Sequence, residues 1–405
     1  MPDQEAEIEI LSERPVFSDV GVVALVPDRF EGAWQPRHQV MTRLSRYFRV
    51  AWLQPPSSWR KVLSARQTKD HLGAPPPEGF TVHDPSRVFP KFYRPRFLGE
   101  ATARARIGSV VASLRRSGVG KIVLYLWRPE FGRELDRVEH DTSCYHIDDE
   151  YSFSEQDRPV SDTELEVLRR VDQVFIHSPA LLEKKGHLNP NTAFVPNGVD
   201  YDAFATPVPE PADLAAVPRP RVGYLGFLKK QLDWGLLEAL ASRHEEWSFV
   251  FVGPRQRGTG IEEILDRVAS RPNAHFLGPK SISEVGAYPQ HFDVSILPYV
   301  MNDYTRYINP LKFYEYLAAG PPIVGVPIRT LKDFPGVISL AKGVEEWSSA
   351  LGRSLHEEAS TAPKLAERRS VAKRYDWDVI VHGIACDLVT HLGRRLPSLT
   401  DSAAE

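Results

Sequence analysis

The sequence predicts an α/β protein built from two doubly wound parallel sheets. Two observations support this fold class. Short, uniformly apolar runs recur along both halves of the chain, and helical patterns separate several of them. A stretch rich in proline and alanine, residues 206–220, has the composition of a linker between the halves. The 405 residues are sufficient for two or three domains of ordinary size.

The first half contains four runs that are typical of buried parallel strands, and a helical pattern at residues 39–48 follows the first run. The four runs are residues 20–27, 50–53, 121–127 and 173–177. We therefore assign residues 16–205 to a first Rossmann-like domain and residues 1–15 to a flexible N-terminus.

The second half alternates five strand-like runs with helical patterns at residues 232–242 and 261–269. The five runs are residues 222–225, 248–252, 274–277, 294–297 and 322–326. Residues 221–375 should form a second Rossmann-like domain, with its ligands at the carboxyl ends of the strands. Residues 376–395 should form a helix that returns to the first domain, before a flexible tail of residues 396–405.

Composition excludes several classes of protein. A chain that is 42% hydrophobic and 25% charged is globular, and it has no apolar stretch near the roughly 18 residues that span a bilayer. Neither half has the G-x-G-x-x-G fingerprint, which disfavours a nicotinamide or flavin enzyme. Cys144 and Cys386 have neither metal-ligand nor disulfide-framework spacing, so we expect a cytoplasmic protein, at or near the inner face of the cell membrane.

Residues 309–322 predict an anion-binding helix that ends directly before a strand. Pro310 suits the first helical turn, where free backbone N–H groups attract phosphate. Lys312 could add a positive charge there, and Glu315, one turn later, could accept two hydrogen bonds from a ribose diol. Taken alone, however, the segment is better explained as an ordinary amphipathic helix with a surface Lys/Glu pair.

Four ordered segments together resemble family 4 (group 1) glycosyltransferases and related bacterial exopolysaccharide glycosyltransferases. The segment from Pro310 resembles the donor-site signature P-x-K-x-x-E-x-x-A-x-G-x-P-V-V, and the other three resemble the V-P-N-G-V-D turn, the first strand with its glycine loop, and the strand before the sugar-binding loop. These three are residues 194–200, 221–226 and 292–299. The resemblance implies the GT-B fold, in which two Rossmann-like domains face a cleft, and metal-independent glycosyl transfer without a cofactor.

The resemblance also implies roles for residues of the second domain. Gly226 would let the backbone approach the diphosphate of the donor, and Lys230 would be the phosphate-binding lysine. Lys312 would be the second cation and would stabilise the leaving group, while Pro310 would begin the phosphate-binding helix and Glu315 would bind the ribose.

The loop at residues 301–307 would face the transferred sugar, so Asn302 and Tyr304 are candidate donor-binding residues. Two positions depart from the family pattern. Phe227 stands where many members have arginine, and Tyr307 stands where members with the E-x7-E motif have their first glutamate. The identity of the sugar and the stereochemical course therefore remain open.

Two acids and a histidine in the first domain are candidate acceptor-side residues. Asp148 and Asp149 follow an apolar run and resemble the Y-x-x-D-D element of bacterial exopolysaccharide transferases, in which the second aspartate is the general base; we predict this role for Asp149. The pair could instead bind a divalent cation, or cap the chain before Tyr151. His38, at the start of the first helix, could contact the acceptor or the diphosphate.

The charge distribution points to an anionic partner. Residues 29–133 contain 20 Lys/Arg against 6 Asp/Glu, and aromatic residues alternate with cations at residues 89–98. This pattern favours peripheral contact with an anionic membrane over nucleic acid, which we do not expect as a partner; a loop that packs its aromatics onto the domain is the alternative.

The predicted function is transfer of a sugar from a UDP- or GDP-type nucleotide sugar to a lipid-linked or oligosaccharide acceptor in polysaccharide synthesis. Two alternatives stay open: a nucleotide-sugar epimerase of the same fold, and a non-catalytic protein that binds glycans or nucleotide sugars. The nucleotide base, the acceptor and the oligomeric state do not follow from the sequence.

Overall fold

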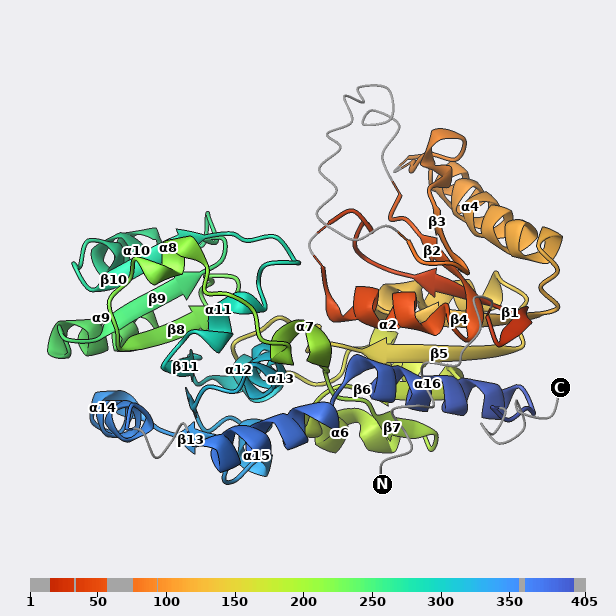
Figure 1. Ribbon diagram of the computed structural model, residues 1–405. Helices are drawn as coiled ribbons and strands as arrows, with labels where there is room; N and C mark the ends of the chain where they lie inside the picture. The colour runs from red at the N-terminus through yellow and green to blue at the C-terminus, as the bar shows by residue number, and fades with distance from the viewer. Residues whose placement is uncertain (1–14, 33, 57–75, 93, 357–360, 397–405) are drawn as a thin grey trace, which may run out of the picture.

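The computed structural model describes residues 15–32, 34–56, 76–92, 94–356 and 361–396. Within these residues the chain forms two parallel sheets, each covered by helices, as Figure 1 shows. The predicted fold class, two Rossmann-like α/β domains, is confirmed. The predicted flexible termini, residues 1–15 and 396–405, lie almost entirely outside the described residues.

The first sheet has seven strands in the order β3-β2-β1-β4-β5-β6-β7, and all paired strands are parallel. Its central strand β1 pairs with β2 and β4, so that Val22 lies between Val50 and Val123, and all three side chains are fully buried. The strands are β1 (Phe17–Leu25), β2 (Phe48–Leu53), β3 (Phe80–His83), β4 (Lys121–Leu126), β5 (Thr142–Ile147), β6 (Gln173–Ile176) and β7 (Thr192–Phe194).

Helices cover both faces of this sheet. They are α2 (Pro36–Leu44), α4 (Arg96–Arg116), α5 (Asp162–Arg170) and α6 (Pro179–Lys185), with 3₁₀ turns η1 (Pro85–Arg87), η2 (Pro129–Asp136) and η3 (Gly186–Leu188). The helix predicted at residues 39–48 is shifted toward the N-terminus in the structure. Pro36 provides a favourable first helical residue, whereas Phe48 already begins β2 and pairs with Phe17.

The second sheet has six parallel strands in the order β10-β9-β8-β11-β12-β13. The strands are β8 (Arg221–Leu225), β9 (Ser248–Val252), β10 (Ala274–Gly278), β11 (Val294–Leu297), β12 (Ile323–Gly325) and β13 (Ser339–Leu340). Around them lie α7 (Tyr201–Ala205), α8 (Ala212–Ala215), α9 (Trp234–Arg243), α10 (Glu262–Ala269), α11 (Ala287–Gln290), α12 (Asp303–Arg306), α13 (Leu311–Ala319), η4 (Leu331–Asp333), α14 (Gly343–Ser354) and α15 (Ala362–Lys373). Short helix α8 lies within the stretch predicted as a linker.

The last helix, α16 (Trp377–His391), runs back along the first domain, as Figure 1 shows, and it packs against α2. It begins at Asp376, whose carboxylate accepts a hydrogen bond from the Asp378 amide. Its apolar face, including Trp377 and Leu388, is buried in the same core as strands β1 and β2. This helix therefore joins the two halves of the chain a second time.

The two domains meet at a tight turn around Gly198. A side chain at this position would approach the Tyr375 carbonyl oxygen to 2.7 Å, so only glycine fits without displacement. Next to it, the Val199 amide donates to the Tyr375 carbonyl at 2.9 Å, and Asn197 donates to the Asn309 carbonyl at 2.7 Å. The turn thus fixes the segment that precedes α13 against the first domain.

Among the described residues, no helix combines the length and apolar character needed to cross a membrane.

Candidate active site between the two domains

Two glycines at the carboxyl ends of β8 and β9 form a close backbone contact. Gly226 and Gly253 have backbone φ angles of 145° and 140°, which residues with a side chain rarely adopt. A Cβ atom on Gly253 would lie 2.0 Å from the Gly226 carbonyl oxygen, and one on Gly226 would lie 3.0 Å from the Lys312 Cε. The Gly226 backbone therefore lies directly against the Lys312 side chain.

Helix α13 supplies the second part of the site. Its residues Lys312 and Glu315 form an ion pair at 2.8 Å, and the Glu315 side chain is 9% exposed. Pro310, which we expected in the first turn, instead precedes the helix at its N-cap, and Gly320 ends the helix with a φ of 103°. The unpaired backbone N–H groups at the start of α13 therefore follow directly after Pro310.

Lys229, which sequence reasoning missed, is less exposed than Lys230 and interacts electrostatically with Asp149. The Lys230 side chain is 46% exposed and forms an ion pair of 3.5 Å with exposed Glu155. Burial lowers the pKa of Lys229, the charge of Lys312 adds to this shift, and the charge of Asp149 opposes it. The charge of Lys229 thus interacts with the charges of both residues, and the tandem Lys-Lys sequence was the signal that could have suggested a role for it.

The side chains of Asn302 and Tyr304 form hydrogen bonds with different parts of the protein. Asn302 caps α12, where its side-chain oxygen accepts a hydrogen bond of 2.9 Å from the Thr305 amide. The Tyr304 hydroxyl crosses to the first domain and donates to Asp149 Oδ2 at 3.1 Å. Only Tyr304 of the two directs its side-chain polar group toward an acid of the first domain.

Asp148 and Asp149, at the carboxyl end of β5, have contrasting environments. Asp148 forms an ion pair of 2.9 Å with Arg37, whose side chain is 8% exposed, and accepts from the Tyr151 hydroxyl at 2.8 Å. Asp149 has no ion pair within the described residues and accepts from Tyr304 and from the Glu150 amide. Asp148 therefore anchors the strand end, and Asp149 retains free lone pairs.

The protonation equilibrium of Asp149 is perturbed. Burial raises the pKa of its carboxyl to about 6, and the nearby charge of Asp148 acts in the same direction. The hydrogen bond from Tyr304 and the charge of Lys229 oppose this shift. A carboxyl with such a pKa can accept a proton near neutral pH, as a general base must.

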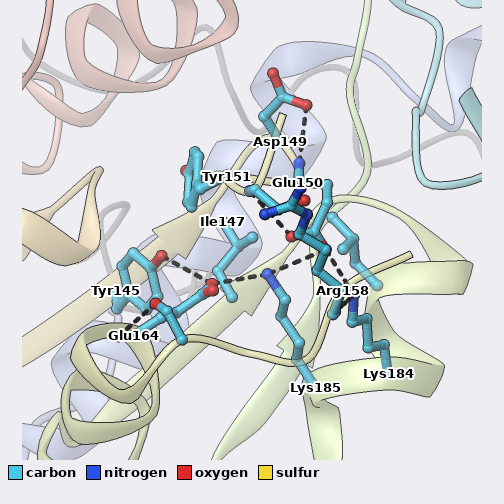
Figure 2. A network of polar contacts seen from close by, with 12 residues as sticks. Tyr145, Ile147, Asp149, Glu150, Tyr151, Arg158, Glu164, Lys184 and Lys185 are labelled. Carbon is cyan, nitrogen blue, oxygen red and sulfur yellow. Dashed lines mark hydrogen bonds and ion pairs between the residues drawn. The ribbon is translucent and has the colours of Figure 1, made fainter. Parts of the chain in front are cut away.

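A buried ionic network supports the segment that carries Asp149, and Figure 2 shows it. The Lys185 ammonium is fully buried and bridges Glu164 at 2.8 Å and Glu150 at 3.4 Å. The Tyr145 hydroxyl donates to Glu164 at 3.1 Å, and Lys184 also approaches Glu150 at 3.4 Å. Because these charges are paired, Glu150 is a structural acid, and the network fixes the backbone next to Asp149.

His38 lies in the core of the first domain rather than at the mouth of a cleft. It is fully buried, and its Nδ1 accepts a hydrogen bond of 3.1 Å from the Gln35 amide at the start of α2. Its ring packs against Trp34 and Trp52, with centroids 5.0 and 4.6 Å away. Burial lowers the pKa of His38 to about 4, so the imidazole is neutral and structural. The structure therefore contradicts the expectation that His38 contacts the acceptor or the diphosphate.

The described residues contain no group of three or more His, Cys, Asp or Glu side chains that could hold a metal ion. What they bring together is one perturbed carboxylate from the first domain and two lysines beside a glycine loop from the second. This arrangement can remove a proton on one side and stabilise an anion on the other.

Comparison with known proteins agrees with this geometry. Residues 219–356 match the family model described as glycosyl transferases group 1. A Bacillus subtilis protein named as a teichuronic acid biosynthesis glycosyltransferase, TuaH, is 28% identical over 237 residues, which are 56% of this chain and 58% of that protein. The aligned part thus spans little more than half of that relative. Both matches are to glycosyltransferases, the class of enzyme that the sequence predicted.

Solved structures with the same fold cover nearly the whole chain. Sucrose-phosphate synthase from Thermosynechococcus elongatus has a TM-score of 0.67 at 15% identity and covers 93% of this chain and 99% of its own. HepE from Anabaena, in complex with UDP and glucose, has a TM-score of 0.65 at 15% identity, with 92% and 99% covered. The family model and the Bacillus relative confirm the predicted resemblance to group 1 glycosyltransferases, and these structures confirm the predicted GT-B fold.

Proposed function

We propose that this protein transfers a sugar from a nucleotide diphosphate sugar to an acceptor hydroxyl, with Asp149 as general base. The observation that carries the proposal is the hydrogen bond from Tyr304 of the second domain to Asp149 of the first, beside Lys229, whose charge acts on Asp149. A base and an anion-stabilising pair on opposite sides of one site are what a displacement at an anomeric carbon needs.

On the donor side, the diphosphate would bind at the Gly226 backbone and the start of α13, between Lys229 and Lys312. Free amides at a helix start and two ammonium groups favour an anion there. Glu315, held by Lys312, is suited to accept hydrogen bonds from the ribose hydroxyls of the same nucleotide. The exposed Lys230 would add a weaker, solvent-screened attraction.

In the reaction, Asp149 takes the proton of the acceptor hydroxyl as its oxygen bonds to the anomeric carbon. The bond from that carbon to the phosphate oxygen breaks, and the nucleoside diphosphate leaves with the electron pair. Lys229 and Lys312 stabilise the charge that develops on it. An inverting displacement requires such a base, so inversion is the course that this site favours.

The acceptor we propose is a lipid-linked or oligosaccharide glycan of a cell-envelope polysaccharide, as the name of the Bacillus relative suggests for that protein. The surface of the first domain is compatible with a lipid-linked acceptor. Val88, Phe97 and Leu98 are 73%, 68% and 39% exposed, within a strongly basic part of the chain. Aromatic and aliphatic side chains among cations favour contact with anionic headgroups.

Calorimetry with UDP, GDP, ADP and their common sugar conjugates, with and without EDTA, tests the donor site, and Lys312→Ala is the matched variant. We expect one nucleotide to bind at micromolar concentration, insensitively to EDTA, and to bind more weakly to the variant. The absence of binding by all of them would overturn the proposal. Loss of binding in EDTA would instead show that a metal is required.

A further inference from the structure

Helix α12 of the second domain and its C-cap residue Tyr307 contact the segment after β5 of the first domain through three hydrogen bonds. The Tyr304 hydroxyl donates to Asp149 Oδ2 at 3.1 Å, and the Tyr307 hydroxyl donates to Asp157 Oδ1 at 2.8 Å. The Asp157 amide donates to Asp303 Oδ2 at 3.0 Å. The first of these bonds reaches the proposed base itself, and the other two hold the surrounding segments together.

Tyr304 lies in the first turn of α12, and hydrogen bonds hold this turn in place. Asn302 and Thr305 form a reciprocal capping box, and the Thr305 hydroxyl also donates to the Val300 carbonyl at 2.5 Å. Burial and the nearby carboxylate of Asp149 raise the pKa of Tyr304 above its ordinary value, so its hydroxyl stays protonated and acts as a donor. The bond to Asp149 is therefore a charge-assisted one whenever Asp149 is ionised.

The two oxygens of Asp149 are held from different domains. Oδ1 accepts from the Glu150 amide of its own strand end at 2.8 Å, whereas Oδ2 accepts from Tyr304 of the other domain. With both bonds formed, rotation of the carboxylate is restricted, and each oxygen still has a lone pair for a substrate hydroxyl. Without Tyr304, only the local amide would orient the group.

We propose that Tyr304 is a positioning residue that orients Asp149 for proton abstraction, and does so only when the two domains are in contact. This inference rests on the proposed function, in which Asp149 is the base. Because the bond crosses from one domain to the other, it makes the orientation of the base depend on contact between the two domains.

The charged and titratable groups that face Asp149 come from three elements. Asp148 lies beside it on the same strand end, Lys229 comes from the loop after β8, and Tyr304 comes from α12, with Arg128 acting on the Tyr304 hydroxyl. The Tyr304 bond lowers the pKa of Asp149, because it stabilises the ionised form. Its removal should therefore move the titration of Asp149 to higher pH.

The test compares Tyr304→Phe with Tyr307→Phe. Both variants lose one phenolic hydroxyl that bridges the domains, but only the first loses the bond to Asp149. The titration of Asp149 is followed by its side-chain ¹³C carboxyl signal in aspartate-labelled full-length protein, assigned by its absence from Asp149→Asn. Nucleotide release is measured in parallel with UDP-glucose, UDP-N-acetylglucosamine, UDP-glucuronic acid, GDP-mannose and ADP-glucose, as a function of pH.

We expect Tyr304→Phe to raise the midpoint of Asp149 and to lower kcat by about ten- to a hundredfold at an unchanged donor KM, as misplacement of a reacting group does. Tyr307→Phe should leave the midpoint unshifted. Equal midpoints in wild type and Tyr304→Phe, equal shifts in both variants, or an unchanged kcat in Tyr304→Phe would each overturn the inference. The titration needs no substrate, so an inactive wild type would count against the proposed function and not against the role of Tyr304.

Discussion

Asp148 and Asp149 are adjacent in sequence, yet substitution to asparagine should lower the free energy of unfolding at Asp148 and leave it nearly unchanged at Asp149. Asp148→Asn removes the charge that pairs with Arg37 at 2.9 Å, where the two side chains are only 4% and 8% exposed. Removing one partner of a buried ion pair typically costs 3–5 kcal/mol. Because Arg37 keeps a second ion pair, with Asp28, we expect the lower end, about 3 kcal/mol.

Asp149→Asn should leave the free energy of unfolding unchanged or raise it slightly at pH 7. Burial raises the pKa of Asp149 to about 6, so the ionised group favours folding less than its protonated form does. Any stability from the protonated carboxyl is present below its unfolded-state pKa and is lost as pH rises through about 6. Asparagine stays neutral at pH 7 and can still accept the hydrogen bond from Tyr304.

Urea unfolding followed by circular dichroism at pH 7, with nucleotide release measured on the same preparations, separates the two roles. Asp148→Asn should unfold at clearly lower urea, whereas Asp149→Asn should unfold like the wild type and lose turnover by at least a hundredfold. Wild-type stability of Asp148→Asn, or equal destabilisation of both variants, would refute this division between an anchoring and a reacting acid.

Three further predictions concern the same site. Lys229→Ala and Lys312→Ala should each weaken donor binding by about tenfold or more in calorimetry, the effect of one lost charge-assisted hydrogen bond, whereas Lys230→Ala should change it by less than about threefold. In wild type, kcat/KM should fall about tenfold per pH unit below pH 6, as Asp149 becomes protonated; a flat profile down to pH 5 would exclude it as the base. Gly253→Ala should lower stability by about 1–3 kcal/mol and weaken donor binding, because its Cβ would lie 2.0 Å from the Gly226 carbonyl; wild-type values of both would contradict the close approach.

The fold followed from the sequence because parallel strands that are buried on both faces leave continuous apolar runs. Strand β9 is the five-residue run Ser248–Val252 that the pattern predicted, and helices α9 and α10 begin within two residues of the predicted patterns. Strands β3, β7 and β13 were missed, since they are only two to four residues long and partly exposed. Helix α2 was misplaced because Tyr47 and Phe48 are apolar at a helical spacing, although a strand begins there.

Only part of the candidate site could be predicted from the sequence. Lys312 and Glu315 were predicted together, and they do form an ion pair, because a spacing of three residues on one helix fixes their proximity. His38 was expected to contact the acceptor or the diphosphate from its place at a helix start, but its ring is buried and packs against Trp34 and Trp52. No periodicity distinguishes a buried histidine at a helix start from an exposed one.

The sequence by itself predicted the longer buried strands, the glycine loop and the lysine–glutamate helix, because each leaves a pattern within a few neighbouring residues. Only the tertiary structure decided which of two adjacent aspartates is neutralised by Arg37 and which of two adjacent lysines faces Asp149. It also brought Tyr304 to Asp149, 155 residues away in sequence. These choices arise from packing between segments far apart in the chain, and such packing sets the burial, charge and hydrogen bonding on which the chemistry of each group depends.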